Sequence, residues 1–121
     1  MVAILLGTGF EEAEALVPAD LMRRAGIEVA LVGVDGARIA GGHGIVVQAD
    51  QTLDAIDPEQ VELVMLPGGL GGVEAMEASS AARELIRRVW DAGRYVAAIC
   101  AAPTLLARMG LLKGRRAVCY P

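Results

Sequence analysis

The sequence is poor in aromatic residues, histidine and cysteine, and each shortage excludes a class of protein. Aromatic residues make up 3% of the 121 residues, so the 55% hydrophobic content is nearly all aliphatic. This favours a sheet of Val, Ile and Leu covered by Ala- and Leu-rich helices over an aromatic-rich β-sandwich. One histidine, His43, and two cysteines, Cys100 and Cys119, leave no structural zinc site and no disulfide framework. This cysteine usage suits a reducing cytoplasm.

The chain also lacks the features of membrane-spanning, secreted and nucleic-acid-binding proteins. No apolar run reaches the roughly 18 residues that a membrane span requires. Met1 is followed directly by the strand-like run Val2–Leu6, without the basic segment and cleavage site of a secretory signal. The net charge is −4, and no basic stripe is interleaved with aromatic residues, which argues against nucleic acid as a partner. We therefore expect a cytoplasmic protein. Its paired arginines are interpreted as solvated ends of helices or strands: Arg23–Arg24, Arg87–Arg88 and Arg115–Arg116.

Apolar runs alternate with amphipathic segments along the whole chain, with no linker or repeat between them. Short apolar runs predict strands over Val2–Leu6, Ile27–Val32, Ile45–Val47, Val61–Leu66, Tyr95–Ile99 and Arg115–Cys119. Apolar spacing of three and four residues, with glycine after the end, predicts helices over Glu11–Ala25, Ala82–Trp90 and Ala101–Met109. Pro18 predicts a kink or restart in the first helix, and the glycines around His43 predict a hairpin. The order predicts one α/β domain, residues 1–121, with a mostly parallel sheet covered on both faces.

The segment from Tyr95 to Pro103 places a cysteine between a predicted strand and a predicted helix. Cys100 is flanked by small residues that permit a crowded turn, as in a nucleophile elbow, and Pro103 suits the first helical turn. The free amides and positive potential of a helix N-terminus stabilise a thiolate. A buried core cysteine is the alternative interpretation. His43 and Cys119 are interpreted as a surface or interface histidine and an uninvolved cysteine.

Two further segments combine glycines or acids with the end of a predicted strand. Gly7–Glu14 reads Gly-Thr-Gly-Phe-Glu-Glu-Ala-Glu, and the missing third glycine and three carboxylates exclude a dinucleotide-binding loop. One acid is expected to point toward Cys100, whereas Glu11 and Glu12 are interpreted as stabilising the helix start. Leu66–Gly69, with Gly71–Gly72 beyond it, either exposes backbone amides to an oxyanion or forms a plain turn.

Taken in order, Gly-x-Glu-Glu-x-Glu, Leu-Pro-Gly-Gly and Ala-Ile-Cys-Ala-Ala-Pro resemble the ThiJ/PfpI superfamily along essentially the whole chain. Within it, the sequence is similar to the branch of the parkinsonism-associated protein deglycase and its bacterial relatives, and Pro18–Ile27 shares this similarity. The resemblance implies a flavodoxin-like three-layer sandwich and usually a homodimer. It implies that Cys100 is the oxidisable nucleophile, that Glu14 is its hydrogen-bonding acid, and that the amides of Gly69 and Ala101 bind an oxyanion. It implies no metal and no cofactor.

Two departures from the family pattern narrow the expected chemistry. Protease-like members carry a histidine directly after the cysteine, where this chain has Ala101, so a Cys-His peptidase is not expected. Some members of the closer branch carry a histidine where this chain has Tyr120, so proton transfer would fall to Glu14 or water. The family domain also continues beyond Pro121 with further strands and a helix. The chain therefore corresponds to the N-terminal two thirds of that domain, as a fragment or with a second polypeptide completing the fold.

The resemblance implies two functions. The first is a cysteine-dependent enzyme that converts a reactive 2-oxoaldehyde such as methylglyoxal into a 2-hydroxy acid, in the manner of a glyoxalase or deglycase. The second is a non-enzymatic redox sensor or chaperone that responds to oxidation of Cys100. A reactive, accessible thiol suits both.

Overall fold

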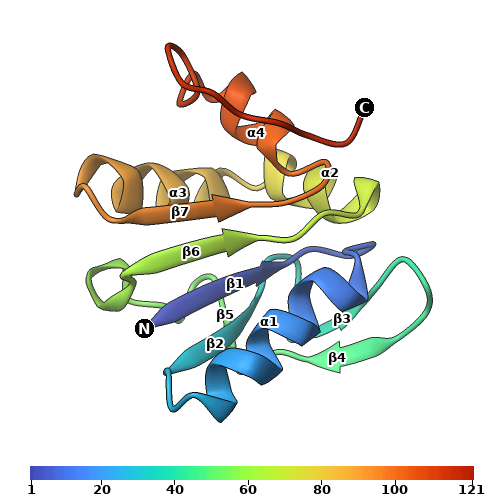
Figure 1. Cartoon of the computed structure of the whole chain (residues 1–121). Helices are drawn as coiled ribbons and strands as arrows, with labels where there is room; N and C mark the ends of the chain where they lie inside the picture. The colour runs from blue at the N-terminus through green and yellow to red at the C-terminus, as the bar shows by residue number, and fades with distance from the viewer.

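A five-stranded parallel sheet forms the centre of the protein. The computed structural model describes residues 1–121, the whole chain. The strand order is β5-β2-β1-β6-β7, and without the short β5 it is the 2-1-3-4 order of flavodoxin-like sheets (Figure 1). The predicted α/β class with a mostly parallel sheet is confirmed. The elements, in chain order, are β1 (Val2–Leu6), α1 (Glu12–Arg24), β2 (Val29–Gly33), β3 (Arg38–Ala40), β4 (Val46–Gln48), β5 (Gln51–Thr52), a 3₁₀ turn (Pro58–Gln60), β6 (Leu63–Leu66), α2 (Leu70–Ala78), α3 (Ser80–Asp91), β7 (Tyr95–Ala98) and α4 (Pro103–Arg108).

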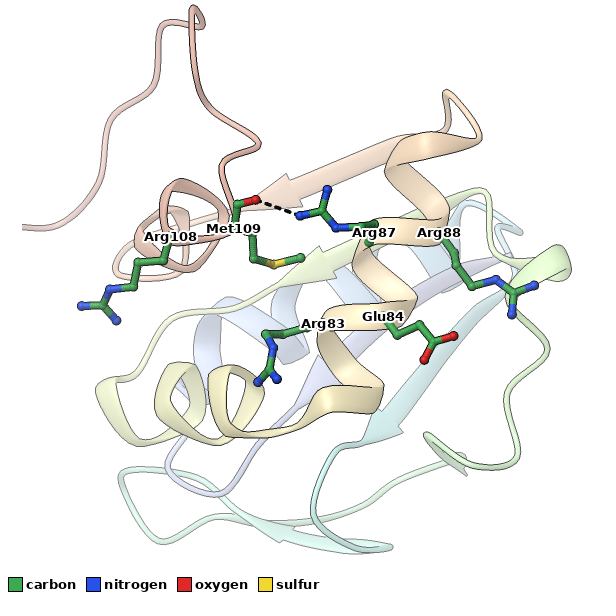
Figure 2. A pocket seen from close by; sticks show the side chains of 6 residues that line it. All are labelled: Arg83, Glu84, Arg87, Arg88, Arg108 and Met109. Atoms are coloured by element: carbon green, nitrogen blue, oxygen red, sulfur yellow. Dashed lines mark hydrogen bonds between the residues drawn. The ribbon is translucent and has the colours of Figure 1, made fainter.

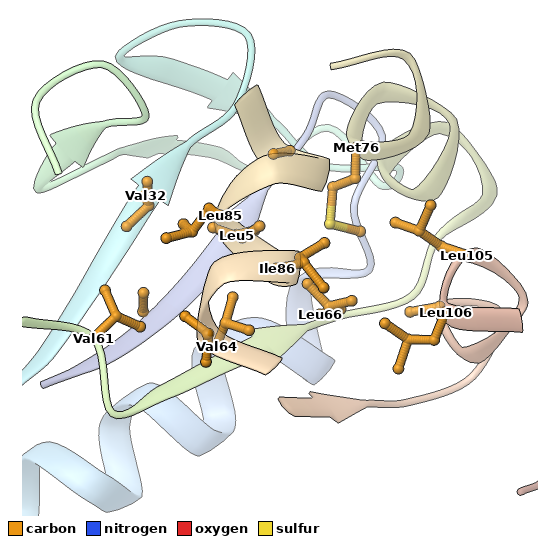
Figure 3. Close-up of a cluster of buried hydrophobic side chains, with 14 of the residues drawn as sticks. Leu5, Val32, Val61, Val64, Leu66, Met76, Leu85, Ile86, Leu105 and Leu106 are labelled. Carbon is orange, nitrogen blue, oxygen red and sulfur yellow. The ribbon is translucent and has the colours of Figure 1, made fainter. Parts of the chain in front are cut away.

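Helices cover both faces of the sheet. Successive side chains of its central strand point to opposite faces, and since all of them are apolar, both faces must be buried. Ala3 and Leu5 of β1 belong to a core of 19 buried residues shared with α2, α3 and α4 (Figure 3). Ile4 and Leu6 belong to a second core of 9 buried residues, on the face that α1 covers. The three layers hold the carboxyl ends of β1, β6 and β7 at one edge of the sheet.

The glycine-rich segment around His43 forms the predicted hairpin, but not as part of the main sheet. Strands β3 and β4 pair antiparallel in a two-stranded sheet of their own, with Ile39 opposite Val47. Backbone hydrogen bonds from the Gly9 amide to the Ala40 carbonyl and from the Gly42 amide to the Phe10 carbonyl attach this hairpin to the loop after β1.

Helix α2 was not predicted, because its sequence begins Leu-Gly-Gly. Close packing requires the second glycine, since a β-carbon at Gly72 would lie 2.7 Å from the Phe10 Cα atom. Helix α1 runs without interruption through Pro18, so the predicted restart is wrong. Its packing on β1 and β2 compensates for the hydrogen bond that a proline cannot donate.

The predicted strand over Arg115–Cys119 is also wrong. Residues 115–121 are exposed and form no ladder with β7, which lies at the edge of the sheet (Figure 1). Only Val118 in this segment is β-branched, and its side chain is 89% exposed, so no apolar face holds the segment to the sheet. The segment is instead held by the Arg115 guanidinium, 4.7 Å from the centre of the Trp90 ring, and by the Tyr120 amide, which donates to the Cys100 carbonyl. None of the helices has the length and apolar character of a membrane span.

Candidate functional site

The three segments selected from the sequence meet at the carboxyl edge of the sheet. The loops after β1 and β6 lie on adjacent strands, and their helices α1 and α2 pack on opposite faces. This is the point where strand order reverses, at which open α/β sheets bind their ligands. The Glu11 amide donates to the Gly68 carbonyl over 2.9 Å and joins the two loops directly.

Cys100 has the conformation expected of a nucleophile elbow. Its φ angle is 59°, and it is the only residue other than glycine with a positive φ. A side chain in this left-handed region costs about 1–2 kcal/mol, and such strain concentrates at functional sites. Pro103 begins α4 three residues later, as predicted, and the thiol is partly buried. The local sequence therefore turns the chain sharply enough to hold the sulfur at the edge of the sheet.

Gly68 brings Cys100 and Glu14 to the same point. The Gly68 amide donates to Glu14 Oε2 over 2.7 Å. A β-carbon built at Gly68 would lie 2.5 Å from Glu14 Oε2, 2.6 Å from Cys100 Cβ and 3.0 Å from Cys100 Sγ. The carboxylate and the thiol therefore both contact the space that a side chain at Gly68 would fill. The hydrogen bond of Glu14 goes to the Gly68 amide, and none joins Glu14 to the sulfur.

The amides of Gly69 and Ala101 donate to no acceptor in the protein. These residues directly follow Gly68 and Cys100, so their N–H groups belong to the same two turns. Gly69 has a φ of 84°, and a β-carbon there would lie 2.6 Å from the Glu11 amide nitrogen. A left-handed glycine in this tight turn is therefore required for its shape. Unpaired amides beside a nucleophile are the groups that an oxyanion needs, and the chemical roles of Cys100, Glu14, Gly69 and Ala101 stay predictions.

Glu12 has a role that the sequence interpretation missed. Its side chain is buried and accepts hydrogen bonds from the His43 amide over 2.7 Å and from the Ile45 amide over 3.3 Å. Its Oε2 atom lies 2.9 Å from His43 Nδ1, and Glu11 Oε1 lies 3.5 Å from the same nitrogen. His43 is at the surface, as predicted, but Glu12 does more than stabilise the helix start. We call this contact between Glu12 and the Gly41–Ile45 loop the hairpin clasp.

The hairpin clasp shifts the protonation of both partners. Burial alone would raise the pKa of Glu12, but hydrogen bonds from His43 and Ile45 outweigh it and lower the pKa to about 2. The hydrogen bond to Glu12, aided by the negative charges of Glu11 and Glu12, raises the pKa of His43. A cation could bind at these three side chains only by displacing the hydrogen bonds that they already make. The sequence signal for the clasp is the density of glycines around His43, since a β-carbon at Gly41 would clash with the Glu12 carboxylate.

Tyr120 contacts the Cys100 turn with its backbone amide and not with its ring. Its amide donates to the Cys100 carbonyl over 2.7 Å, and its side chain is 64% exposed. Together with Leu70, Ala101 and Thr104 it lines a hollow of about 240 Å³ next to the Cys100 turn. Cys119 is exposed and forms no disulfide.

The arrangement of these turns matches a known family. The family model described as DJ-1/PfpI family matches residues 1–121. The chain belongs to this family. Protein dj-1beta of Drosophila melanogaster is 39% identical over 119 residues, which are 98% of this chain and 64% of that protein. A deglycase of Pyrococcus horikoshii is 32% identical over 120 residues, 99% of this chain and 72% of that protein.

The fold comparison agrees with the family assignment. The structure of oxidised DJ-1 from Toxoplasma gondii has a TM-score of 0.94 and 35% identity, over 99% of this DJ-1/PfpI chain and 66% of that chain. This member therefore spans less than two thirds of the length of several relatives that it matches, dj-1beta among them.

Proposed function

We propose that this DJ-1/PfpI family member is a cysteine-dependent, cofactor-independent enzyme that acts on reactive 2-oxoaldehydes such as methylglyoxal, in defence against carbonyl and oxidative stress. The observation that carries the proposal is the meeting of the Cys100 thiol and the Glu14 carboxylate at Gly68, beside two unpaired amides. Three archaeal relatives at 32–33% identity that are named deglycases support the same class of chemistry.

The proposed reaction begins with addition of the Cys100 thiolate to the aldehyde carbon. A carbon–sulfur bond forms, the carbonyl electron pair moves to oxygen, and the amides of Gly69 and Ala101 stabilise that oxyanion until it is protonated. Glu14 then removes the proton from the hemithioacetal carbon, and a proton is returned to the neighbouring carbon, which leaves a thioester of the 2-hydroxy acid. Water hydrolyses the thioester, which releases lactate from methylglyoxal and restores the thiol. No external oxidant or reductant is consumed.

Lactate release from methylglyoxal tests this proposal. We expect turnover by the unmodified protein, no turnover by Cys100→Ala, and a loss of about 10²–10⁴-fold in Glu14→Gln. Cys119→Ala and Glu11→Gln are the matched controls, because they change the same residue types outside the proposed catalytic pair, and both should retain activity. Lactate release that survives Cys100→Ala would refute the mechanism.

A redox-sensing or chaperone function is the second candidate. It is supported by the relative from Toxoplasma gondii, whose structure was solved in an oxidised form. Two molecules of hydrogen peroxide would oxidise the Cys100 thiolate, first to a sulfenate and then to a sulfinate, each peroxide being reduced to water, and the Gly69 and Ala101 amides would stabilise the new anion. This function predicts stoichiometric peroxide consumption without lactate, and suppression of client aggregation that depends on the oxidation state of Cys100.

A further inference from the structure

A second hollow, lined mostly by charged residues, lies between α3 and α4 (Figure 2). Its volume is about 630 Å³, and Figure 2 shows the residues that line it: Arg83, Glu84, Arg87, Arg88, Arg108 and Met109. We call it the arginine groove. Arg87 and Arg88 were predicted to be solvated and are exposed, and the fold places them with Arg83 and Arg108 along one groove in a chain whose net charge is −4.

Two of these arginines are held in place without a counter-ion. Arg87 Nη2 donates to the Met109 carbonyl over 2.8 Å, and Arg83 Nη1 donates to the Glu77 carbonyl. Neither guanidinium has a carboxylate within 4.0 Å. A carbonyl oxygen occupies one donor and neutralises no charge, so each fork retains N–H groups for another acceptor.

The other two arginines of the groove are already paired with acids. Arg88 lies 3.3 Å from a carboxylate oxygen of Glu59, and Arg108 Nη1 lies 2.6 Å from Glu77 Oε2. The unpaired positive charge of the groove is therefore concentrated on Arg83 and Arg87, and Glu84 brings one unpaired negative charge to its edge. Arg83 and Arg87 are four apart on α3, where like charges are neighbours and destabilise the helix.

The position of Arg83 adds a further electrostatic cost. Arg83 follows Ser80 by three residues at the start of α3, the end at which a helix disfavours cations and favours anions. A bound dianion would remove both the repulsion between the two arginines and this unfavourable placement.

We propose that the arginine groove binds phosphate monoesters of small polyhydroxyl metabolites, with the phosphate on Arg83 and Arg87. Arg83 and Arg87 are four residues apart on α3, and the double charge of a phosphate monoester, spread over three oxygens, matches their two unpaired positive charges better than the single charge of a carboxylate does. The hollow is larger than a bare phosphate, and Glu84 at its edge accepts hydrogen bonds from hydroxyl groups. The proposal does not rest on the chemistry of Cys100.

Titration of the isotope-labelled chain with glucose 6-phosphate, followed through its arginine Nε–Hε signals, tests this site. Inorganic phosphate and glucose are the comparison arms. We expect saturable binding at about 0.1 M salt, tighter for glucose 6-phosphate than for inorganic phosphate, none for glucose, and shifts of the Arg83 and Arg87 signals. The double substitution Arg83→Gln/Arg87→Gln should weaken binding at least about tenfold. The matched control is Arg38→Gln, which removes an exposed arginine without a carboxylate partner on the β3–β4 hairpin and should leave binding unchanged.

Three results would overturn the proposal: no saturation, an equal loss of affinity in Arg38→Gln, or binding of glucose 6-phosphate no tighter than that of inorganic phosphate. The signals of the unsubstituted chain decide the matter if the double variant fails to fold. Saturable shifts at other arginines with Arg83 and Arg87 unmoved would then refute the site.

Discussion

Substitution of Gly68 by alanine tests whether Cys100 and Glu14 share one tightly packed point. The new β-carbon would lie 2.5 Å from Glu14 Oε2 and 2.6 Å from Cys100 Cβ, closer than non-bonded atoms approach. Gly68 is buried, so the two side chains must move apart. Overpacking of this kind costs about 1–3 kcal/mol, which lowers Tm by roughly 4 °C per kcal/mol in a chain of this size.

The matched control is Gly42→Ala, which makes the same chemical change where the nearest atom to the new β-carbon is 3.4 Å away. This substitution should be neutral or stabilise by up to about 1 kcal/mol, because alanine restricts the unfolded chain. Urea unfolding of both variants gives the energetic comparison, and the alkylation rate of Cys100 gives the effect on the site. We expect Gly68→Ala alone to lose stability and to change the alkylation rate. A Gly68→Ala protein as stable and as reactive as the unsubstituted one would refute the described packing.

Three further predictions follow from the strain at Cys100, the hairpin clasp and the exposed face of α1. Cys100→Gly should be roughly 0.5–1 kcal/mol more stable than Cys100→Ala in urea unfolding, since only glycine relieves the positive φ, and equal stability would contradict the strain. Because the pKa of His43 is raised, its pairing with Glu12 stabilises the fold fully below about pH 6.5, and this stabilisation is lost as the pH rises through the raised pKa. In urea unfolding, the unsubstituted protein should therefore be more stable than His43→Asn at about pH 6, and this difference in stability should shrink toward about pH 9. A difference that grows with pH would contradict the raised pKa. We further propose that a second copy of the chain covers Val17 and Leu21, which are 54% and 59% exposed. Val17→Asp should then convert a dimer into a monomer, as measured by light scattering. A monomeric unsubstituted protein would contradict this proposal.

The sequence predicted those parts of the fold that depend on local patterns. The continuous apolar run Val2–Leu6 is the central strand β1, with the predicted bounds, and the apolar spacing over Ala82–Trp90 lies within α3. The turn at Cys100 was predictable for the same reason, since small residues and Pro103 are local requirements of an elbow.

Features that depend on distant contacts were missed or predicted wrongly. Helix α2 was missed because its glycines are explained only by their packing against residues 8–10, about sixty residues earlier. The hairpin clasp was missed because the residues adjacent to Glu12 in the sequence do not indicate that the distant Gly41–Ile45 loop buries its carboxylate. A strand over Arg115–Cys119 was predicted from a pattern that no neighbouring strand supports in the structure.

If the fold, and not simple exposure, makes Cys100 the reactive thiol, the two cysteines of the chain must differ in reactivity in a way that exposure does not explain. Cys119 is exposed whereas Cys100 is partly buried, so exposure alone predicts faster alkylation of Cys119. Iodoacetamide labelling at neutral pH, quantified peptide by peptide by mass spectrometry, measures both rates in one sample. We expect Cys100 to react faster than Cys119, and Glu14→Gln to alter the rate of Cys100 while leaving that of Cys119 unchanged. Faster labelling of Cys119 in the folded protein would show that exposure, and not the fold around Cys100, sets thiol reactivity.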